Sequence, residues 1–118
     1  MAASAQRNTA AAEEPRVVEK TSIPNFDRMI HEHVRLAIMS ALAVNDKLTF
    51  VELRDIVQTS DGNISVHSRK LEEAGYLVTK KYFVGRIPRT DYQMTAAGRR
   101  AFEKYIAHME ALVKTNKK

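Results

Sequence analysis

The chain has 118 residues, which is enough for one small domain with its own core and too few for two. Hydrophobic residues make up 44% of it, as in a globular protein, and the formal net charge of +5 favours an anionic partner such as nucleic acid or a membrane surface. Without cysteine there are no disulfides or thiolate metal sites, and without a signal peptide or a roughly 20-residue apolar run we expect a soluble cytoplasmic protein.

Residues 1–22 are rich in Ala, Glu, Thr and Lys and show no sustained apolar periodicity, so we expect a disordered N-terminal tail. The folded domain is predicted to cover residues 23–95. Its first helix should run from about Asn25 to Ala43, because apolar residues between Phe26 and Leu42 recur at helical spacing.

Two short helices follow, with only a few residues between them. Thr49 and Glu52 have the spacing of a capping box, which predicts the start of a helix that stops near Gln58. The next helix is expected over Thr59–Gly75, since polar side chains that can cap a helix stand at its start and a glycine at its end. Two short helices so closely joined must cross steeply, which is the helix-turn-helix arrangement.

The outward face of the Thr59–Gly75 helix carries short or hydrogen-bonding side chains at its leading end and cations further along. Such a helix suits insertion into the DNA major groove. The simpler interpretation is an amphipathic helix with a solvated polar face. The candidate DNA-contacting residues on this helix are Ser60, Gly62, Asn63, Ser65, Val66, Arg69 and Lys70.

A β-hairpin is predicted next. Tyr76–Val84 is rich in β-branched and aromatic residues, Gly85–Arg89 has loop composition, and Thr90–Met94 is the expected returning strand. Its tip and shoulders carry four cations, with Asp91 the acidic residue nearby: Lys80, Lys81, Arg86 and Arg89. A basic hairpin directly after a helix-turn-helix is a wing. The sequence thus predicts an α+β fold with a three-helix core, an antiparallel wing and a long C-terminal helix.

The last helix is predicted over residues 96–118, capped by Thr95 and packed on the same domain. Its apolar stripe consists of Phe102, Tyr105, Ile106, Met109, Leu112 and Val113. The preceding elements already supply a core, so we expect a second copy of the chain to cover this stripe and form a homodimer. The alternative is packing against the chain's own first helix.

No catalytic or metal-binding motif is present in the sequence. His31 and His33 are two residues apart and point to different sides of a helix, so they cannot share one ion there. There is no nucleophile elbow, and 4 glycines in the chain leave no phosphate-cradling loop. We therefore expect no enzyme, metal or cofactor, and we interpret His67 as a structural residue of the third helix.

The run from about Phe26 to Leu112 resembles the winged-helix transcriptional regulators of the ArsR and MarR type, in particular the small single-domain group with a long basic wing. The matching segments are HEHVRLAIMSAL at 31–42 and DGNISVHSRKLEEAGYLVTKKYFVGRIPRTDYQMTAAGR at 61–99. The chain departs from this group in lacking the cysteines of the ArsR metal sensors. It also has Ser68 where Leu is usual, and we expect either that this hydroxyl bonds a backbone carbonyl, such as that of Ile64, or that the core is locally underpacked.

This resemblance implies a dimeric, sequence-specific regulator of bacterial or archaeal type that binds double-stranded DNA at an inverted-repeat operator. Its third helix would enter the major groove and its wing would lie on the backbone or in the minor groove. The positions that carry over as base-facing are Asn63, Ser65, Val66 and Arg69, and the wing contacts are Lys80, Lys81, Arg86 and Arg89.

Two other functions are compatible with such a domain, because fold does not fix function. One is a protein–protein interaction module without specific DNA binding, which the four wing cations disfavour. The other is binding to structured RNA, whose A-form major groove is too narrow for a recognition helix. Space between the first and last helices could hold a small-molecule effector, but no residue identifies one.

Overall fold

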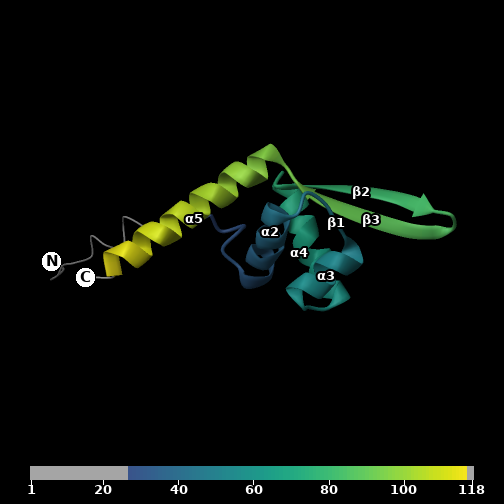
Figure 1. Ribbon diagram of the computed structural model, residues 1–118, viewed down its shortest axis with the longest axis horizontal. Helices are drawn as coiled ribbons and strands as arrows, with labels where there is room; N and C mark the ends of the chain where they lie inside the picture. Colours follow the sequence, from purple (N-terminus) through teal and green to yellow (C-terminus); the bar gives the residue numbers. More distant parts are fainter. Residues whose placement is uncertain (1–26, 117–118) are drawn as a thin grey trace, which may run out of the picture.

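The computed structural model describes residues 27–116 and confirms the predicted α+β winged arrangement (Figure 1). The elements in chain order are α2 (His33–Val44), β1 (Leu48–Thr49), α3 (Phe50–Val57), α4 (Asp61–Glu73), β2 (Leu77–Val84), β3 (Ile87–Met94) and α5 (Ala96–Asn116). The strands form one antiparallel sheet in the order β1-β3-β2. The tail predicted for residues 1–22 lies outside the described residues. Within residues 27–116, no helix is both long and apolar enough to cross a membrane.

Figure 1 shows a body made of α2, α3 and α4, with the β2–β3 wing and the α5 helix projecting from it in opposite directions. The core of this body draws at least one fully buried apolar side chain from each of the three helices. Those with the least exposed surface are Ile30, Ile38, Met39, Leu42, Leu53, Ile64 and Leu71. Burial of such side chains is the main favourable term in folding, so this cluster fixes how α4 is presented.

The first helix begins later than the sequence predicts. The Asp27 carboxylate accepts hydrogen bonds from the backbone N–H groups of Met29 at 2.8 Å and Ile30 at 3.3 Å, which closes a turn instead. Glu32 then stands in an extended conformation and caps α2 by accepting from the Arg35 N–H at 2.8 Å. The predicted start at Asn25 is therefore wrong for the described residues, because two acidic side chains divert the chain before His33.

Other helix ends agree with the sequence. Thr49 and Glu52 form the predicted capping box, with each side chain accepting from the other residue's backbone N–H. Gln58 ends α3 in the left-handed conformation, at φ 59°, and Gly75 follows α4 at φ 86°. Glycine adopts that conformation without strain, which explains why the chain can leave α4 for the sheet at this point.

Tyr76 joins three segments that are far apart in sequence. Its hydroxyl donates to the Asp27 carboxylate at 2.5 Å, and its backbone carbonyl accepts from the Thr95 N–H at 3.0 Å. Burial, followed by the bond to Asp27, raises the pKa of Tyr76 to about 12. The phenol thus stays protonated, and Tyr76 holds the entry to α2, the exit from α4 and the entry to α5 together.

Gly98, in the first turn of α5, lies against the backbone of Tyr76. A Cβ atom at this position would overlap the Tyr76 carbonyl oxygen, and backbone atoms cannot rotate away as a side chain can. Gly98→Ala should therefore lower the free energy of unfolding by about 1–3 kcal/mol or more, as overpacked cores do. Urea denaturation followed by circular dichroism measures this change.

Gly62→Ala is the matched control, because a Cβ at Gly62 would meet nothing within 4 Å. Gly62 is helical, so alanine there should leave stability unchanged or raise it by up to about 1 kcal/mol. Equal stability of the two variants would show that the close approach of Gly98 to the Tyr76 backbone does not require glycine.

Candidate nucleic-acid interface

Helices α3 and α4 are joined by residues 58–60 and form the predicted helix-turn-helix. The Ser60 hydroxyl caps α4 by accepting from the Asn63 N–H at 3.1 Å. The Arg54 guanidinium donates to the Asp61 carboxylate at 2.9 Å, across the joint between the helices. This bond, with a second to Asp55, raises the pKa of Arg54. The start of α4 is thus fixed by a cap and an ion pair.

The α4 residues predicted to contact DNA lie on its accessible face. Six of them are exposed, and Ser65 is half-buried: the exposed ones are Ser60, Gly62, Asn63, Val66, Arg69 and Lys70. The Asn63 amide donates to the Thr59 hydroxyl at 2.9 Å, so its side chain lies over the joint. No described segment covers this face, and a groove-binding helix requires such access.

Ser68 of α4 faces inward, and the structure shows which backbone carbonyl its hydroxyl bonds. Ser68 is only 3% exposed, and its hydroxyl donates to the Ser65 carbonyl at 3.4 Å. The predicted partner, the Ile64 carbonyl, is therefore wrong. A serine fits here because its hydroxyl is satisfied by the helix backbone and lines the same polar hollow as Tyr92.

His67 ties α4 to the start of α2. Its Nδ1 lies 3.0 Å from Nη1 of Arg35 and 3.6 Å from the Glu32 carboxylate. Burial opposes the charge on Glu32, but backbone hydrogen bonds from Arg35 and Val34 outweigh it and lower the pKa of Glu32. His67 is thus held against two charged groups inside the fold, which agrees with the structural role interpreted from the sequence.

The wing is a hairpin with a two-residue turn. Strands β2 and β3 pair from Leu77 opposite Met94 to Val84 opposite Ile87, so only Gly85 and Arg86 lie in the turn. Gly85 has φ 64°, the conformation that such turns require at their first position. The loop predicted over residues 85–89 is therefore wrong in length, since Ile87 and the two residues after it belong to β3.

The register divides the wing cations between the two faces of the hairpin, because side chains alternate along a strand. Lys81 shares a face with Thr79 and Tyr92, and this face is turned toward α4. Lys80 and Arg89 lie on the other face. Lys80 stands directly opposite Asp91, whose carboxylate accepts from the Tyr82 hydroxyl at 3.1 Å and raises the pKa of Tyr82.

A polar hollow lies between α4 and the wing. Arg69 and Lys81 stand on its two sides and bring two positive charges to it, against the single carboxylate of Glu72. The Thr79 hydroxyl, which also lines the hollow, is buried with no hydrogen-bond partner in residues 27–116. Its full lining is Ser65, Ser68, Arg69, Glu72, Thr79, Lys81 and Tyr92. The structure thus brings one predicted helix cation and one predicted wing cation to the same place.

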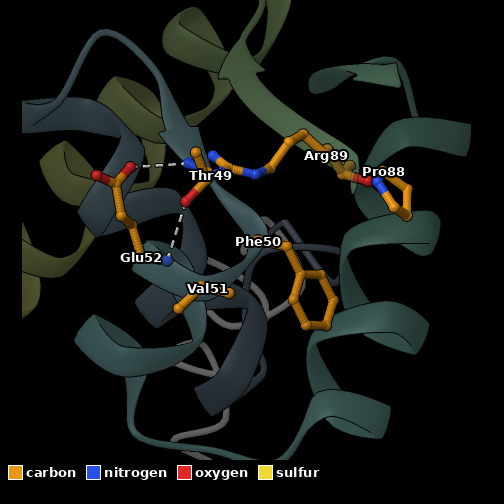
Figure 2. A pocket seen from close by; sticks show the side chains of 7 residues that line it. Thr49, Phe50, Val51, Glu52, Pro88 and Arg89 are labelled. Atoms are coloured by element: carbon orange, nitrogen blue, oxygen red, sulfur yellow. Dashed lines mark hydrogen bonds between the residues drawn. The ribbon is translucent and has the colours of Figure 1, made fainter. Parts of the chain in front are cut away.

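Arg89 occupies a different hollow, between β3 and the start of α3 (Figure 2). Glu52, already bound to the Thr49 N–H at 2.9 Å, lines the same hollow and carries the opposite charge. Figure 2 shows the Arg89 side chain extended toward Thr49. Arg89 therefore lies apart from the hollow that Arg69 and Lys81 share.

The apolar stripe of α5 is covered only in part. Tyr105, predicted as a dimer contact, is 3% exposed, and its hydroxyl lies 2.8 Å from Nδ1 of His31. It belongs to the chain's own core, because the first half of α5 packs on α2. Ile106 and Val113 are 37% and 55% exposed, and the remaining stripe residues, Phe102, Met109 and Leu112, are half-buried.

Within residues 27–116, no group of three or more His, Cys, Asp or Glu side chains is arranged to hold a metal ion. The sequence reasoning missed two contacts that position the interface, the His67–Arg35 contact and the Tyr76–Asp27 bond, because each joins residues more than 30 apart. The sequence reasoning also missed that the turn end of the wing exposes apolar side chains. The signal for that tip was present as Phe83, Val84 and Ile87 around the turn.

A family model described as a winged helix DNA-binding domain matches residues 34–113. An uncharacterised protein of Methanocaldococcus jannaschii is 32% identical over 87 residues, which cover 74% of this chain and 95% of that protein. The structure of a transcriptional regulator homologue from Pyrococcus horikoshii matches with a TM-score of 0.73 and 26% identity, covering 78% of this chain and 91% of that one.

A PadR family transcriptional regulator from Eggerthella lenta shares the fold alone, with a TM-score of 0.60 and 21% identity over 74% of this chain and 84% of that one. The family match spans the helix-turn-helix, the whole wing and most of α5, which are the elements built here from their residues. The chain belongs to the winged helix DNA-binding domain family.

Proposed function

We propose that this protein is a transcription regulator that binds double-stranded DNA in a sequence-specific way, with α4 in the major groove. The observation that carries the proposal is the hollow shared by Arg69 of α4 and Lys81 of the wing. A backbone strand that runs from the major to the minor groove would pass between these two elements. The cations there would neutralise its phosphates, and the exposed face of α4 would meet the base edges.

Selectivity would come from the leading half of α4. Asn63 and Ser65 offer short hydrogen-bonding groups, and the methyl groups of Val66 suit contact with a thymine methyl. The major groove is about 12 Å wide and admits one helix, so the leading residues of α4 reach base edges when α4 enters it. The wing cations then set affinity without choosing the sequence.

Competition tests this proposal against binding to RNA. Full-length protein bound to a fluorescent DNA duplex at low salt should be displaced by unlabelled DNA duplex far more effectively than by an RNA duplex of the same length, because the A-form major groove excludes α4. Equal displacement by both competitors would contradict groove entry by α4. Failure to retain any duplex would favour a protein-interaction module instead.

The protein is proposed to act as a homodimer joined through α5. Stripe residues Phe102, Ile106, Met109, Leu112 and Val113 keep apolar surface that the described residues do not fully cover. A two-fold dimer presents two copies of α4, so its operator would be an inverted repeat with half-sites about one helical turn apart. The proposed regulation is repression, since a protein seated across an operator blocks access to it.

Ile106→Glu combined with Val113→Glu should convert the dimer to a monomer, because two carboxylates would be buried at the interface without partners. Sedimentation velocity measures the change. These two residues are preferable to Tyr105, whose replacement would damage the core.

Ala111→Glu is the control for the dimer test, since Ala111 is exposed and lies on the opposite side of α5. That variant should remain dimeric. If the double variant also remains dimeric, α5 is not the interface.

A further inference from the structure

The tip of the wing is apolar on both of its faces. Phe83 stands opposite Pro88 on the face turned toward α4, and Val84 stands opposite Ile87 on the other face. The exposed fractions are 71% for Phe83, 49% for Val84 and 58% for Ile87. Together the four side chains form the apolar tip, which closes at the Gly85–Arg86 turn.

No described part of the chain covers the apolar tip. Figure 1 shows β2 and β3 extending well beyond the body, with the turn at the far end from α5. Exposed apolar clusters usually mark surfaces that bind something, because water is an unfavourable neighbour for them. An exposed apolar hairpin end would also promote aggregation, so its presence calls for an occupant.

The charges around the tip indicate what that occupant is. Arg86 lies in the turn itself, and Lys80 and Lys81 follow on β2, against Asp91, which is 9% exposed and bonded to Tyr82. The Arg89 side chain extends toward Thr49 and is not counted among them. A strongly cationic surround favours a polyanion over a typical protein surface. An apolar tip with cations behind it therefore fits a nucleic acid that presents apolar surface between two rows of phosphates.

Because the apolar tip has apolar side chains on both faces of the hairpin, its shape further limits the kind of partner surface that can cover it. A flat partner surface could cover only one face of the hairpin, whereas a slot covers both. The minor groove is such a slot: phosphates line its rims and the stacked base pairs form its floor, and it is about 6 Å wide. A hairpin with side chains on both faces is thicker than that, so it can enter only if the groove opens.

We propose that the apolar tip is a wedge that enters the minor groove of the bound duplex, opens it and partly unstacks one base-pair step, so that the DNA bends. This inference rests on the proposed function and adds a deformation to it. Apolar wedges of this type kink a duplex toward the major groove, at a cost that contacts elsewhere offset. Selectivity would then extend to flexible steps under the wing that no side chain reads directly.

The test compares DNA bending by the full-length protein and by a variant in which Phe83, Val84 and Ile87 are all threonine. Threonine keeps the strand preference and removes most of the apolar surface. The bend is measured by energy transfer between dyes at the two ends of a duplex selected from a genomic library. A 2-aminopurine placed under the wing reports unstacking by a rise in fluorescence.

Wild-type protein should bring the ends closer and raise the 2-aminopurine signal. The triple-threonine variant should bind the same duplex roughly 10-fold more weakly, with the same salt dependence, and leave it straight. Val78→Thr is the control, because it introduces the same side chain on the same hairpin at a half-exposed position near the body. This variant should bend DNA as the wild type does. Arg86→Ala should weaken the salt dependence and keep the bend.

A straight duplex with wild-type protein, or an unchanged bend with the triple variant, overturns the wedge while leaving DNA binding intact. Loss of self-association in the triple variant, without a change in bend, would show that the tip contacts a second copy and would also overturn it. If the wild-type protein retains no duplex at low salt, the proposed function itself fails, and the wedge fails with it.

Discussion

Arg69→Ala and Lys81→Ala should weaken DNA binding in two different ways, although both side chains line the same hollow. Arg69 is on α4, where a guanidinium can bond a guanine edge, so its loss should cost about 1–3 kcal/mol on the selected duplex and relax the sequence preference. Lys81 is on the wing, so its loss should weaken binding to all duplexes alike. Fluorescence anisotropy with selected and random duplexes at several salt concentrations measures both effects.

The salt dependence distinguishes the two roles quantitatively. Removal of one phosphate contact should reduce the slope of log affinity against log salt by about 0.9, and this is expected for Lys81→Ala. Equal losses for Arg69→Ala on the two duplexes, with a similar change in slope, would show that Arg69 binds a phosphate beside Lys81. Arg54→Ala is unsuitable as a control, because Arg54 holds the start of α4 through Asp61.

Ile64→Ala should lower the free energy of unfolding by about 2–5 kcal/mol, the cost of removing a large side chain from a packed core. Ile64 has 0% exposed surface and is part of the cluster that joins α4 to α2 and α3. Small domains are stable by only about 5–15 kcal/mol, so this one change should shift the thermal midpoint by many degrees. Calorimetry of the purified variant measures the shift.

Val66→Ala is the matched control for Ile64→Ala. Val66 is two residues further along the same helix and is 45% exposed, so its truncation removes little buried surface. Its effect on stability should stay within about 0.5 kcal/mol. A comparable loss of stability in both variants would mean that α4 does not present the face assigned to it.

The fold was predictable where the signals are local. The Thr49–Glu52 capping box, Gly75 after α4 and the division of α4 into buried and exposed faces all depend on residues within a few positions of one another. Helix caps and helical periodicity act over this range, so they could be read from the sequence. The exposed set of candidate residues on α4 follows from the same periodicity.

Contacts between distant segments could not be predicted. The late start of α2 depends on carboxylates that bond nearby N–H groups, and Asp27 is also held by Tyr76, 49 residues further along the chain. Tyr105 fits the α5 stripe as well as any neighbour, and only the packing of α5 on α2 beside His31 shows that it is buried. Helical periodicity predicts which face of α5 a residue lies on, but it does not predict how far that residue is buried.

The wing shows the same limit in its register. Gly85 and Pro88 both suggested a loop, yet Pro88 lies within β3. It is tolerated because β1 pairs only with Asp91 and Tyr92, so β3 has no strand on that side at Pro88. The resulting two-residue turn decides which cations of the two strands share a face, because a turn one residue longer would shift β3 by one position against β2 and bring Arg89 to the face of Lys81.

The most direct test of the account is the affinity of the full-length protein for a selected duplex and a random duplex, measured between roughly 50 and 200 mM salt. We predict that both affinities fall linearly on a log–log plot and that the selected duplex is bound at least about a thousandfold more tightly. Equal affinity for the two duplexes, or no binding to either at the lowest salt, would contradict a regulator that reads DNA with α4 and holds it with the wing.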